Sequence, residues 1–356
     1  MSLKSFYQNK KIFITGHTGF KGSWLVSVLL KFGAKVTGYS LNDNKRKNYE
    51  NFVDYKKVKN IYGDISDLKK IKKSIEKNNP QIVFHLAAQP LVSSSYKDPL
   101  NTFKTNFMGS VNIFEIVRKS KNIKSLVMIT SDKCYLNVEV SKGYREQDRL
   151  GGKDPYSASK ASVEVAFQAY LNSFFSKKNN IGVATARAGN VIGGGDWSDD
   201  RIIPDCVRTV MKKKSLVIRS PLATRPWQHV LEPVSGYLVL GKKLFLNPRR
   251  FSGSWNFGPR ANEVKNVKEV AKIIIRDISS EKKTKIIFKK GSFKEANLLK
   301  LNSNKAKEVL NWTTRWTMNQ ALRKTSQWYK HYLRKKNTRQ LTNNQIDNYF
   351  FGKNYD

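Results

Sequence analysis

Residues 11–22 read KIFITGHTGFKG, and this stretch decides the fold. Its first five residues form an apolar run typical of a buried β-strand, and apolar side chains at helical spacing follow Gly22 as far as Phe32. Between the two, Gly16, Gly19 and Gly22 are spaced G-x-x-G-x-x-G. Glycines at such a junction allow a tight turn and let backbone N–H groups at the helix N-terminus approach a pyrophosphate. The stretch therefore predicts a dinucleotide-binding unit, with an ordinary glycine-rich turn as the alternative.

The chain that follows this unit alternates short apolar runs with longer amphipathic segments. Further strands are expected at 35–39, 81–86, 125–130 and 182–187. Helices are expected at 68–77, 105–119 and 159–176. Strands that alternate with helices of this length indicate parallel βαβ units, so we expect an α/β fold with a Rossmann-type doubly wound parallel sheet. Ligands bind such sheets at the carboxyl ends of the strands.

After about residue 190 the pattern breaks into short pieces. Helices are expected at 264–278 and 305–310, and prolines such as Pro233 interrupt the segments before them. We assign residues 1–190 to the dinucleotide-binding Rossmann domain. Residues 191–356 are expected to form mainly a smaller C-terminal substrate-binding lobe, with a soft boundary and some segments that return to the first domain.

Composition limits the class of protein. Of the 356 residues 39% are hydrophobic, which is enough for a globular core, and 66 Lys+Arg against 27 Asp+Glu give a formal net charge of +39. The basic residues are scattered through every segment, so a compositional bias is favoured over a nucleic-acid surface, although the positive field would attract an anionic substrate. Cys134 and Cys206 show neither a disulfide framework nor a metal-ligand spacing, which favours a cytoplasmic protein without a metal. No segment approaches the roughly 20 apolar residues that span a bilayer, and residues 1–11 lack a signal-peptide pattern.

Two polar motifs accompany the expected strands and helices. Residues 130–133, Thr-Ser-Asp-Lys, follow the strand at 125–130 and bring a hydroxyl, a carboxylate and an ammonium to the cofactor edge of the sheet. Tyr156 and Lys160 stand four residues apart on one face of a helix. There the ammonium is expected to lower the pKa of the phenol, so that it can accept a proton near neutral pH. Taken alone, residues 130–133 also fit a solvated turn. Taken alone, Tyr156 and Lys160 also fit a pair of residues on the surface of a helix.

The residues that would distinguish NAD from NADP give a weaker indication than the two motifs. The tip of the second strand, residues 39–42, carries no acid to bind the adenosine ribose, and the first acid is Asp43. Asp64 follows a possible third strand and is a candidate adenine contact, with a turn or cap residue as the alternative. The residues alone therefore leave the choice between NAD and NADP open.

Together and in this order, the motifs resemble the extended short-chain dehydrogenase/reductase family. The likeness rests on TGHTGFKG at 15–22, HLAA at 85–88, the hydroxyl of Ser131 and the Tyr-x-x-x-Lys pair at 156–160. It implies a permanently held NAD. The residues that it implies for cofactor binding are Gly16, Thr18, Gly19, Phe20, Lys21, Gly22, Asp64, Ile65, Leu86, Ala87, Ala88, Tyr156 and Lys160.

Longer segments narrow the resemblance to nucleotide-sugar 4,6-dehydratases, and within them to those that act on CDP-glucose. These segments include SDKCY at 131–135, DPYSASK at 154–160, RAGNVIGGGDW at 187–197 and RPWQHV at 225–230, and the likeness covers essentially the whole chain.

The resemblance also implies the catalytic roles. Tyr156, with Lys160 and Ser131, would remove the proton of the hydroxyl on sugar carbon 4 while a hydride passes to NAD. Lys133 stands where related dTDP-sugar dehydratases carry Glu and would take the carbon 5 proton, while Asp132 would protonate the hydroxyl that leaves carbon 6. Return of the hydride to carbon 6 would give CDP-4-keto-6-deoxy-glucose and water. Because a lysine base must be neutral, we expect Lys133 to be buried close to other positive charges.

Substrate contacts are implied in the same way. An arginine fork suits a pyrophosphate because it binds two oxygens at once. Residues 91–96, LVSSSY, depart from the family, which usually carries Arg there. The implied substrate-binding residues are Gln89, Asn190, Arg201, Arg208, Arg225 and His229.

Two alternatives remain. One is a dehydratase or epimerase for a dTDP-, GDP- or UDP-linked sugar, and the other is a non-catalytic NAD-binding or nucleic-acid-binding protein. The resemblance further implies a homodimer through the helices at 105–119 and 159–176, with a homotetramer also open.

Overall fold

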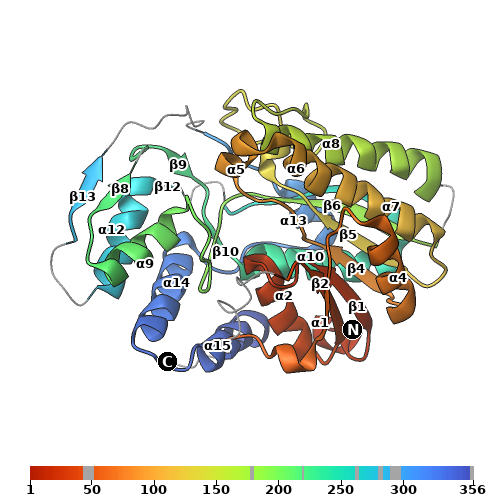
Figure 1. Cartoon of the computed structure of the whole chain (residues 1–356), viewed down its shortest axis with the longest axis horizontal. Coiled ribbons are helices and arrows are strands. Elements are labelled where there is room, and N and C mark those ends of the chain that lie inside the picture. The colour runs from red at the N-terminus through yellow and green to blue at the C-terminus, as the bar shows by residue number, and fades with distance from the viewer. Residues whose placement is uncertain are drawn as a thin grey trace.

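The computed structural model describes residues 1–42, 52–176, 180–218, 220–260, 264–279, 284–288 and 298–352, so Asp43 lies outside the described residues. Its centre is a seven-stranded sheet of order β11-β6-β5-β4-β1-β2-β3, in which all neighbouring strands run parallel (Figure 1). The strands are β1 (Lys11–Thr15), β2 (Lys35–Ser40), β3 (Lys59–Tyr62), β4 (Ile82–His85), β5 (Ser125–Ile129), β6 (Gly182–Ala188) and β11 (Gly253–Phe257). The chain starts in the middle of the sheet and winds outward first to one edge and then to the other. The expected doubly wound Rossmann-type fold is therefore confirmed.

Alternate residues of the buried strands pack into two separate cores, one on each face of the sheet. In β1, Ile12 and Ile14 face one core and Phe13 faces the other. The first core is covered by α1 (Leu3–Tyr7), α2 (Phe20–Lys31), α10 (Leu231–Leu246), α14 (Met318–Leu333) and α15 (Thr338–Phe351). The second is covered by α4 (Leu68–Asn78), α7 (Gly109–Lys119) and α8 (Pro155–Tyr170). Burial on both faces explains why the strands read as continuous apolar runs.

Helix boundaries differ from the expected ones for local reasons. The expected helix at 105–119 is preceded by α5 (Val92–Lys97) and α6 (Pro99–Phe103), and residues Lys104–Met108 form a π-helical turn before α7. Asn266 and Glu269 form a capping box, so α12 (Val267–Ile278) begins three residues later than expected. Pro233 does not break the chain as expected, because it lies in the first turn of α10, where a missing N–H removes no helical hydrogen bond.

A smaller group of elements lies beside the sheet (Figure 1). It contains α9 (Ile202–Lys212), α12, and the paired short strands β8 (Leu216–Ile218) with β13 (Ile286–Phe288) and β9 (Thr224–Arg225) with β12 (Lys265–Asn266). Two further strands, β7 (Val191–Ile192) and β10 (Gln228–His229), form a parallel pair between this group and the sheet. The chain then returns to the sheet through α10, α11 (Pro248–Phe251) and β11, and α13 (Asn304–Leu310) packs on β11.

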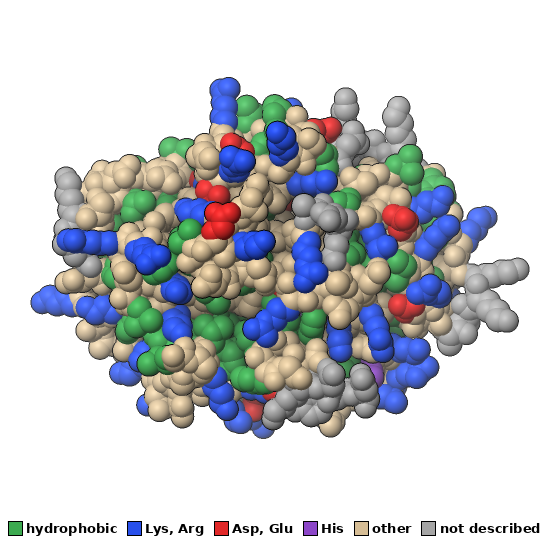
Figure 2. Space-filling model, turned by 180° about the vertical axis from the view of Figure 1, so that it is seen from behind, with side chains coloured by type: hydrophobic (Ala, Val, Ile, Leu, Met, Phe, Trp, Pro, Cys, Tyr) green, Lys and Arg blue, Asp and Glu red, His purple; other side chains and the backbone are tan. Residues whose placement is uncertain are grey.

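Figure 2 shows lysine and arginine side chains spread over one whole face of the molecule, with few acidic side chains between them. On this face the positive charge is distributed rather than gathered into one patch. Among the described residues, no helix is long and apolar enough to cross a membrane.

Candidate active site

The glycine-rich turn between β1 and α2 is closely packed backbone. Gly16 has a φ of +70°, and a Cβ on it would lie 2.7 Å from the backbone nitrogen of Ala87. A Cβ on Gly22 would lie 2.1 Å from the carbonyl oxygen of Gly16, whereas Gly19 is the N-cap of α2 and has an ordinary φ of −84°. Only glycine fits positions 16 and 22. The N-terminal N–H groups of α2 are left facing the carboxyl edge of the sheet. The turn therefore fits a pyrophosphate at this helix N-terminus.

The other candidate cofactor residues lie around this turn. Thr18 and Phe20 are buried, and Leu86, Ala87 and Ala88 are half-buried directly after β4. Lys21 lies in the first turn of α2. Burial and the positive charge of Arg201 lower the pKa of Lys21 to about 8, and the carboxylate of Asp132 opposes this shift. Lys21 is thus close enough to Asp132 and Arg201 for their charges to act on it.

Asp64 and Ile65 follow β3, the strand at one edge of the sheet. One carboxylate oxygen of Asp64 accepts a hydrogen bond from the backbone N–H of Ser66 at 2.8 Å. Ile65 is buried, and its carbonyl accepts a hydrogen bond from the side chain of Asn112 at 2.9 Å. Asp64 therefore caps a turn that Ile65 anchors to α7, and its contact with adenine stays a prediction.

Tyr156 and Lys160 project from the first two turns of α8. The helix begins there because Asp154, its N-cap, accepts a hydrogen bond from the backbone N–H of Ser157 at 2.9 Å, and Pro155 occupies the first helical position. Both side chains are buried, and their spacing of four places them on one face of the helix.

The pKa of Tyr156 shifts in the direction opposite to the expected one. We expected the ammonium of Lys160 to lower it, but burial raises the pKa of Tyr156 to about 12, although a hydrogen bond with Ser131 opposes the shift. Burial also lowers the pKa of Lys160 to about 8, and the carboxylate of Glu164 is among the groups that oppose this shift. The cost of desolvating a phenolate is therefore larger than the effect of the neighbouring cations, and this expectation was wrong.

The segment after β5 carries the other three candidate catalytic residues. Ser131 donates a hydrogen bond to Asp132 Oδ1 at 2.9 Å and accepts one from the backbone N–H of Lys133 at 3.2 Å, which caps the 3-10 turn η4 (Asp132–Cys134). Asp132 is buried, and burial raises the pKa of its carboxyl group despite the nearby Lys133, Lys21 and Arg225. Lys133 is exposed, so the expectation that it is buried was wrong. The reason is that η4 turns successive side chains in different directions.

Three of the candidate substrate residues lie close to these groups. Arg201 pairs with the buried Asp196 at 3.0 Å and acts electrostatically on Tyr156. Arg225 lies near enough to Asp132 to oppose its pKa shift. Asn190 is half-buried at the end of β6, and its neighbour Gly189 would place a Cβ 3.0 Å from Asp132 Oδ2.

The other three are held by contacts within the protein. Arg208 donates to the carbonyls of Trp197 and Ser198 at 3.2 and 3.1 Å and pairs with Asp205 at 2.6 Å. Gln89 donates to Thr102 at 3.0 Å and accepts from the N–H of Leu91 at 2.6 Å.

His229 is fully buried, and its ring makes edge contacts with Trp24 and Trp316. Burial lowers the pKa of His229 to about 3, so the imidazole is neutral. In this structure His229 is a core residue rather than a substrate contact, because its aromatic neighbours, distant in sequence, enclose it.

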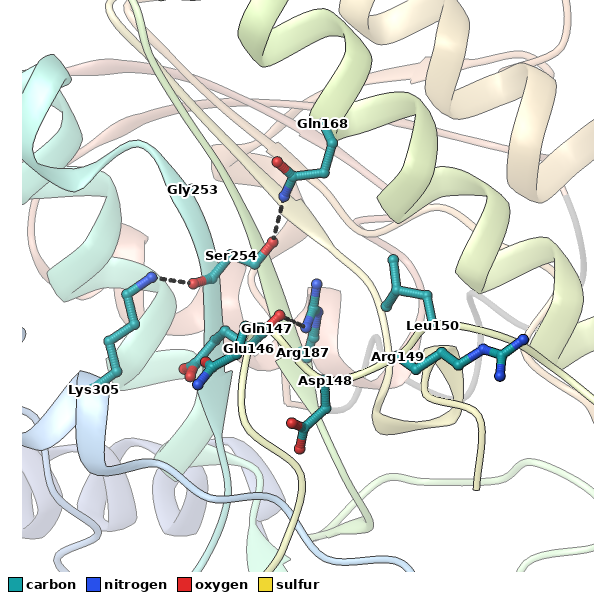
Figure 3. A pocket seen from close by; sticks show the side chains of 10 residues that line it. All are labelled: Glu146, Gln147, Asp148, Arg149, Leu150, Gln168, Arg187, Gly253, Ser254 and Lys305. Carbon is teal, nitrogen blue, oxygen red and sulfur yellow. Dashed lines mark hydrogen bonds between the residues drawn. The ribbon is translucent and has the colours of Figure 1, made fainter. Parts of the chain in front are cut away.

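A separate hollow of ≈ 700 Å³ lies near β6 and β11, and its lining includes Glu146, Gln168, Arg187, Ser254 and Lys305 (Figure 3). None of the candidate site residues lines it. Among the described residues, no cluster of three or more His, Cys, Asp or Glu side chains could hold a metal ion.

Sequence reasoning missed a buried ion pair, Glu164 with Arg187, next to the candidate catalytic segment. It also missed Asn106, which donates to the backbone carbonyl of Gln89 at 3.1 Å and to the hydroxyl of Ser159 at 2.9 Å. The available signal was the presence of charged or amide side chains inside apolar helices and strands, where they are seldom buried without partners.

Comparison with known proteins identifies the family. The model of the family described as GDP-mannose 4,6-dehydratase matches residues 13–325. A CDP-glucose 4,6-dehydratase of Salmonella typhimurium is 42% identical over 351 residues, which cover 97% of this chain and 98% of that protein. A dTDP-glucose 4,6-dehydratase of Haemophilus influenzae is 26% identical and covers 89% of this chain and 97% of that protein.

Solved structures agree with this placement. The dTDP-glucose 4,6-dehydratase of Bacillus anthracis, solved in complex with NAD, has a TM-score of 0.74 and 25% identity over 91% of this chain and 96% of that one. An epimerase of Methanothermobacter thermautotrophicus shares the fold, with a TM-score of 0.82 and 22% identity over 93% of this chain and 95% of that one. By sequence, fold and motif order, the chain belongs to the GDP-mannose 4,6-dehydratase family, within the extended short-chain dehydrogenase/reductases.

Proposed function

We propose that the chain is an NAD-dependent CDP-glucose 4,6-dehydratase that converts CDP-glucose to CDP-4-keto-6-deoxy-glucose and water. The observation that carries the proposal is the full-length likeness, at 42% identity, to a Salmonella typhimurium protein with that activity in its name. The candidate acid and base groups at one sheet edge support it. The product is a precursor for deoxysugars such as those of lipopolysaccharide O-antigen, and a cytoplasmic location suits this step.

The residues around the glycine turn fit NAD. Gly16, Gly19 and Gly22 leave room where Cβ atoms would otherwise stand, and the N-terminus of α2 suits a pyrophosphate. Tyr156, Lys160 and the residues after β4 lie at the same edge and would hold the nicotinamide ribose and ring. When bound, NAD supplies hydride acceptance and return, and it is regenerated in each cycle.

The first step depends on Tyr156 as base. Its phenolate would take the proton from the hydroxyl on carbon 4, with Ser131 as hydrogen-bond partner. A pKa of about 12 is too high for a base at neutral pH, so the phenolate needs further positive charge at the site. Lys160, with its pKa near 8, and the positively charged ring of the oxidised cofactor are the available sources.

Elimination of water requires an acid at carbon 6 and a base at carbon 5. Asp132 suits the acid role because burial raises the pKa of its carboxyl group and favours the protonated form that can donate. Lys133 is the candidate base at carbon 5. Its exposed side chain has the freedom to turn toward a bound sugar.

Substrate binding is assigned to the positive groups at the site. Arg201 and Arg225 would contact the sugar or the pyrophosphate, and the net charge of +39 favours capture of a nucleotide sugar with two negative phosphates.

A homodimer is part of the proposal. Large apolar side chains are exposed along α6, the π turn that follows it, α8 and the turn at its end, and exposed apolar patches of this kind mark interfaces. They are Leu100, Met108, Val165 and Phe174, with exposed fractions of 83%, 47%, 59% and 39%.

The test is to incubate the purified protein separately with CDP-, dTDP-, GDP- and UDP-glucose and to measure the alkaline absorbance of a 4-keto sugar. We expect signal with CDP-glucose at a rate well above the other three. Signal with another nucleotide alone would replace the substrate assignment, and epimer formation without a 4-keto sugar would replace the reaction.

A further inference from the structure

A charged pair is buried under the candidate active site. Glu164 on α8 and Arg187 on β6 lie 2.7 Å apart between Oε2 and a terminal guanidinium nitrogen, and their side chains are 0% and 1% exposed. Such a pair contributes little net stability compared with apolar side chains of the same size, because desolvation offsets the attraction. Its presence in a core therefore calls for a reason other than stability.

Glu164 holds the start of the candidate catalytic segment. Its second carboxylate oxygen, Oε1, accepts a hydrogen bond from the hydroxyl of Thr130 at 2.5 Å, and Thr130 directly precedes Ser131. Thr185 on β6 donates to Oε2 at 2.8 Å. The carboxylate thus links the end of β5 to β6 from its position on α8.

Arg187 holds the other end of the same segment. One nitrogen of its guanidinium donates to the hydroxyl of Tyr135 at 2.6 Å and to the carbonyl of Glu146 at 2.9 Å. The guanidinium carbon also lies 4.9 Å from the centre of the Tyr135 ring. Residues 131–134 therefore run between two anchors, Thr130 and Tyr135, that both attach to this one pair.

The pair also connects this segment to the helix that carries the other catalytic candidates. Glu164 is one helical turn beyond Lys160 and two beyond Tyr156 on α8. A shift of Glu164 relative to Arg187 would change the distance between the group formed by Tyr156 and Lys160 and the group formed by Asp132 and Lys133.

We propose that Glu164 and Arg187 are a positioning pair, which holds the Asp132–Lys133 segment in register with the Tyr156–Lys160 helix so that elimination can follow oxidation. The inference rests on the proposed dehydratase function. Neither residue touches the reacting atoms, and both act through Thr130 and Tyr135.

The hollow in Figure 3 supplies a matched control. Gln168 lies one helical turn beyond Glu164 on α8 and points to the hydroxyl of Ser254, which it contacts at 3.4 Å. The hydroxyl of Ser254 in turn donates to Glu164 Oε2 at 3.2 Å. Gln168→Ala removes only the contact on the far side of Ser254 and leaves the hydrogen bonds of Glu164 and Arg187 in place, so we expect it to keep wild-type activity.

Two variants distinguish a positioning role of the pair from an effect of its charges and from a requirement for folding. Glu164→Gln with Arg187→Met removes both charges together and avoids an unpaired buried charge. Thr130 and Thr185 donate to different carboxylate oxygens of Glu164, so the single amide oxygen of the glutamine can accept from one of them but not from both in their present positions. Arg187→Lys keeps the positive charge opposite Glu164 but loses the planar fork that also reaches Tyr135. Melting temperature, bound NAD, kcat and KM with CDP-glucose, and the absorbance of the cofactor during turnover are measured for each.

We expect folded, NAD-loaded variants in which kcat falls roughly 100-fold, the loss that a misplacement of about 1 Å can cause, with little change in KM. The bound cofactor should remain largely reduced during turnover, because the step after oxidation is the one that slows. A folded variant with wild-type kcat would overturn the proposal, as would a fall in kcat in Gln168→Ala of the same size. If neither variant folds, the pair is needed for the fold alone and the proposal is also overturned. Absence of turnover in the wild-type protein would instead refute the dehydratase function itself.

Discussion

The change Gly19→Ala tests whether the glycine turn holds a cofactor. Gly19 has an ordinary φ of −84°, and the nearest atom to an added Cβ is the carbonyl oxygen of Gly16 at 3.4 Å, which is normal contact. The fold should therefore accept alanine, at a cost of about 1 kcal/mol or less for a poorer N-cap. A methyl group at the N-terminus of α2 would, however, stand where a pyrophosphate must approach, so we expect the purified variant to contain little or no NAD.

Gly22→Ala provides the contrast. Its Cβ would lie 2.1 Å from the carbonyl oxygen of Gly16, and ordinary contact begins at 3.4 Å, so α2 and the turn must separate by about 1.3 Å. Overpacking of this kind costs typically 1–3 kcal/mol, so this variant should lose both stability and NAD.

The assay measures the nucleotide released from denatured protein and the thermal unfolding of each variant. Stability is compared with that of cofactor-free wild type, because bound NAD itself raises the melting temperature. The reasoning would be refuted if Gly19→Ala retained one NAD per chain, or if Gly22→Ala unfolded at the same temperature as cofactor-free wild type.

Three further predictions concern single side chains. Asp132→Asn cannot donate a proton, so formation of the 4-keto product should fall about 10²–10⁴-fold while NAD stays bound, and a loss below tenfold would remove Asp132 as the acid. Lys133→Met should abolish formation of the 4-keto product while NAD stays bound, and full activity in this variant would end the assignment of Lys133 as the carbon 5 base. Burial raises the pKa of Glu232 from 4.5 to about 7, so the folded protein binds an extra proton between these values and the stability that Glu232 contributes is lost as pH rises through this window. Glu232→Gln does not titrate, so its stability relative to wild type should rise by something on the order of 3 kcal/mol between pH 4.5 and 7 in denaturant titrations, and a constant difference would contradict the shift.

Local sequence patterns were sufficient for the Rossmann half of the fold. In β1, the glycine turn and α2, the deciding interactions lie within 12 consecutive residues, so the spacing of Gly16, Gly19 and Gly22 carries the structure. Helix α10 was missed because it is buried on nearly all sides and has no polar face that repeats every 3.6 residues.

Contacts between distant segments were not predictable from one sequence. His229 belongs to a motif that resembles a substrate-binding segment, yet Trp24 and Trp316 bury it from two different parts of the chain. We expected Lys133 to be buried because a lysine base must be neutral, but the direction of a side chain in η4 depends on the turn that Ser131 caps. The position of a charged or polar residue in the sequence therefore does not reveal whether its side chain is buried.

The pKa shifts at the site suggest how the fold divides the chemistry. Burial raises the pKa of both Tyr156 and Asp132, which favours the protonated form of each, and lowers the pKa of Lys160 and Lys21. One low-dielectric environment therefore favours the protonated Asp132 that the proposed acid role requires, but it works against the proposed role of Tyr156 as a base. A protein that uses both groups needs positive charge close to the phenol. Lys133, Lys21 and Arg225 oppose the raised pKa of Asp132 but do not reverse it. Ser131 contacts both Tyr156 and Asp132, so a change at either side chain also affects the other through this hydroxyl. The placement of residues 131–134 by Thr130 and Tyr135 therefore matters to both proposed half-reactions.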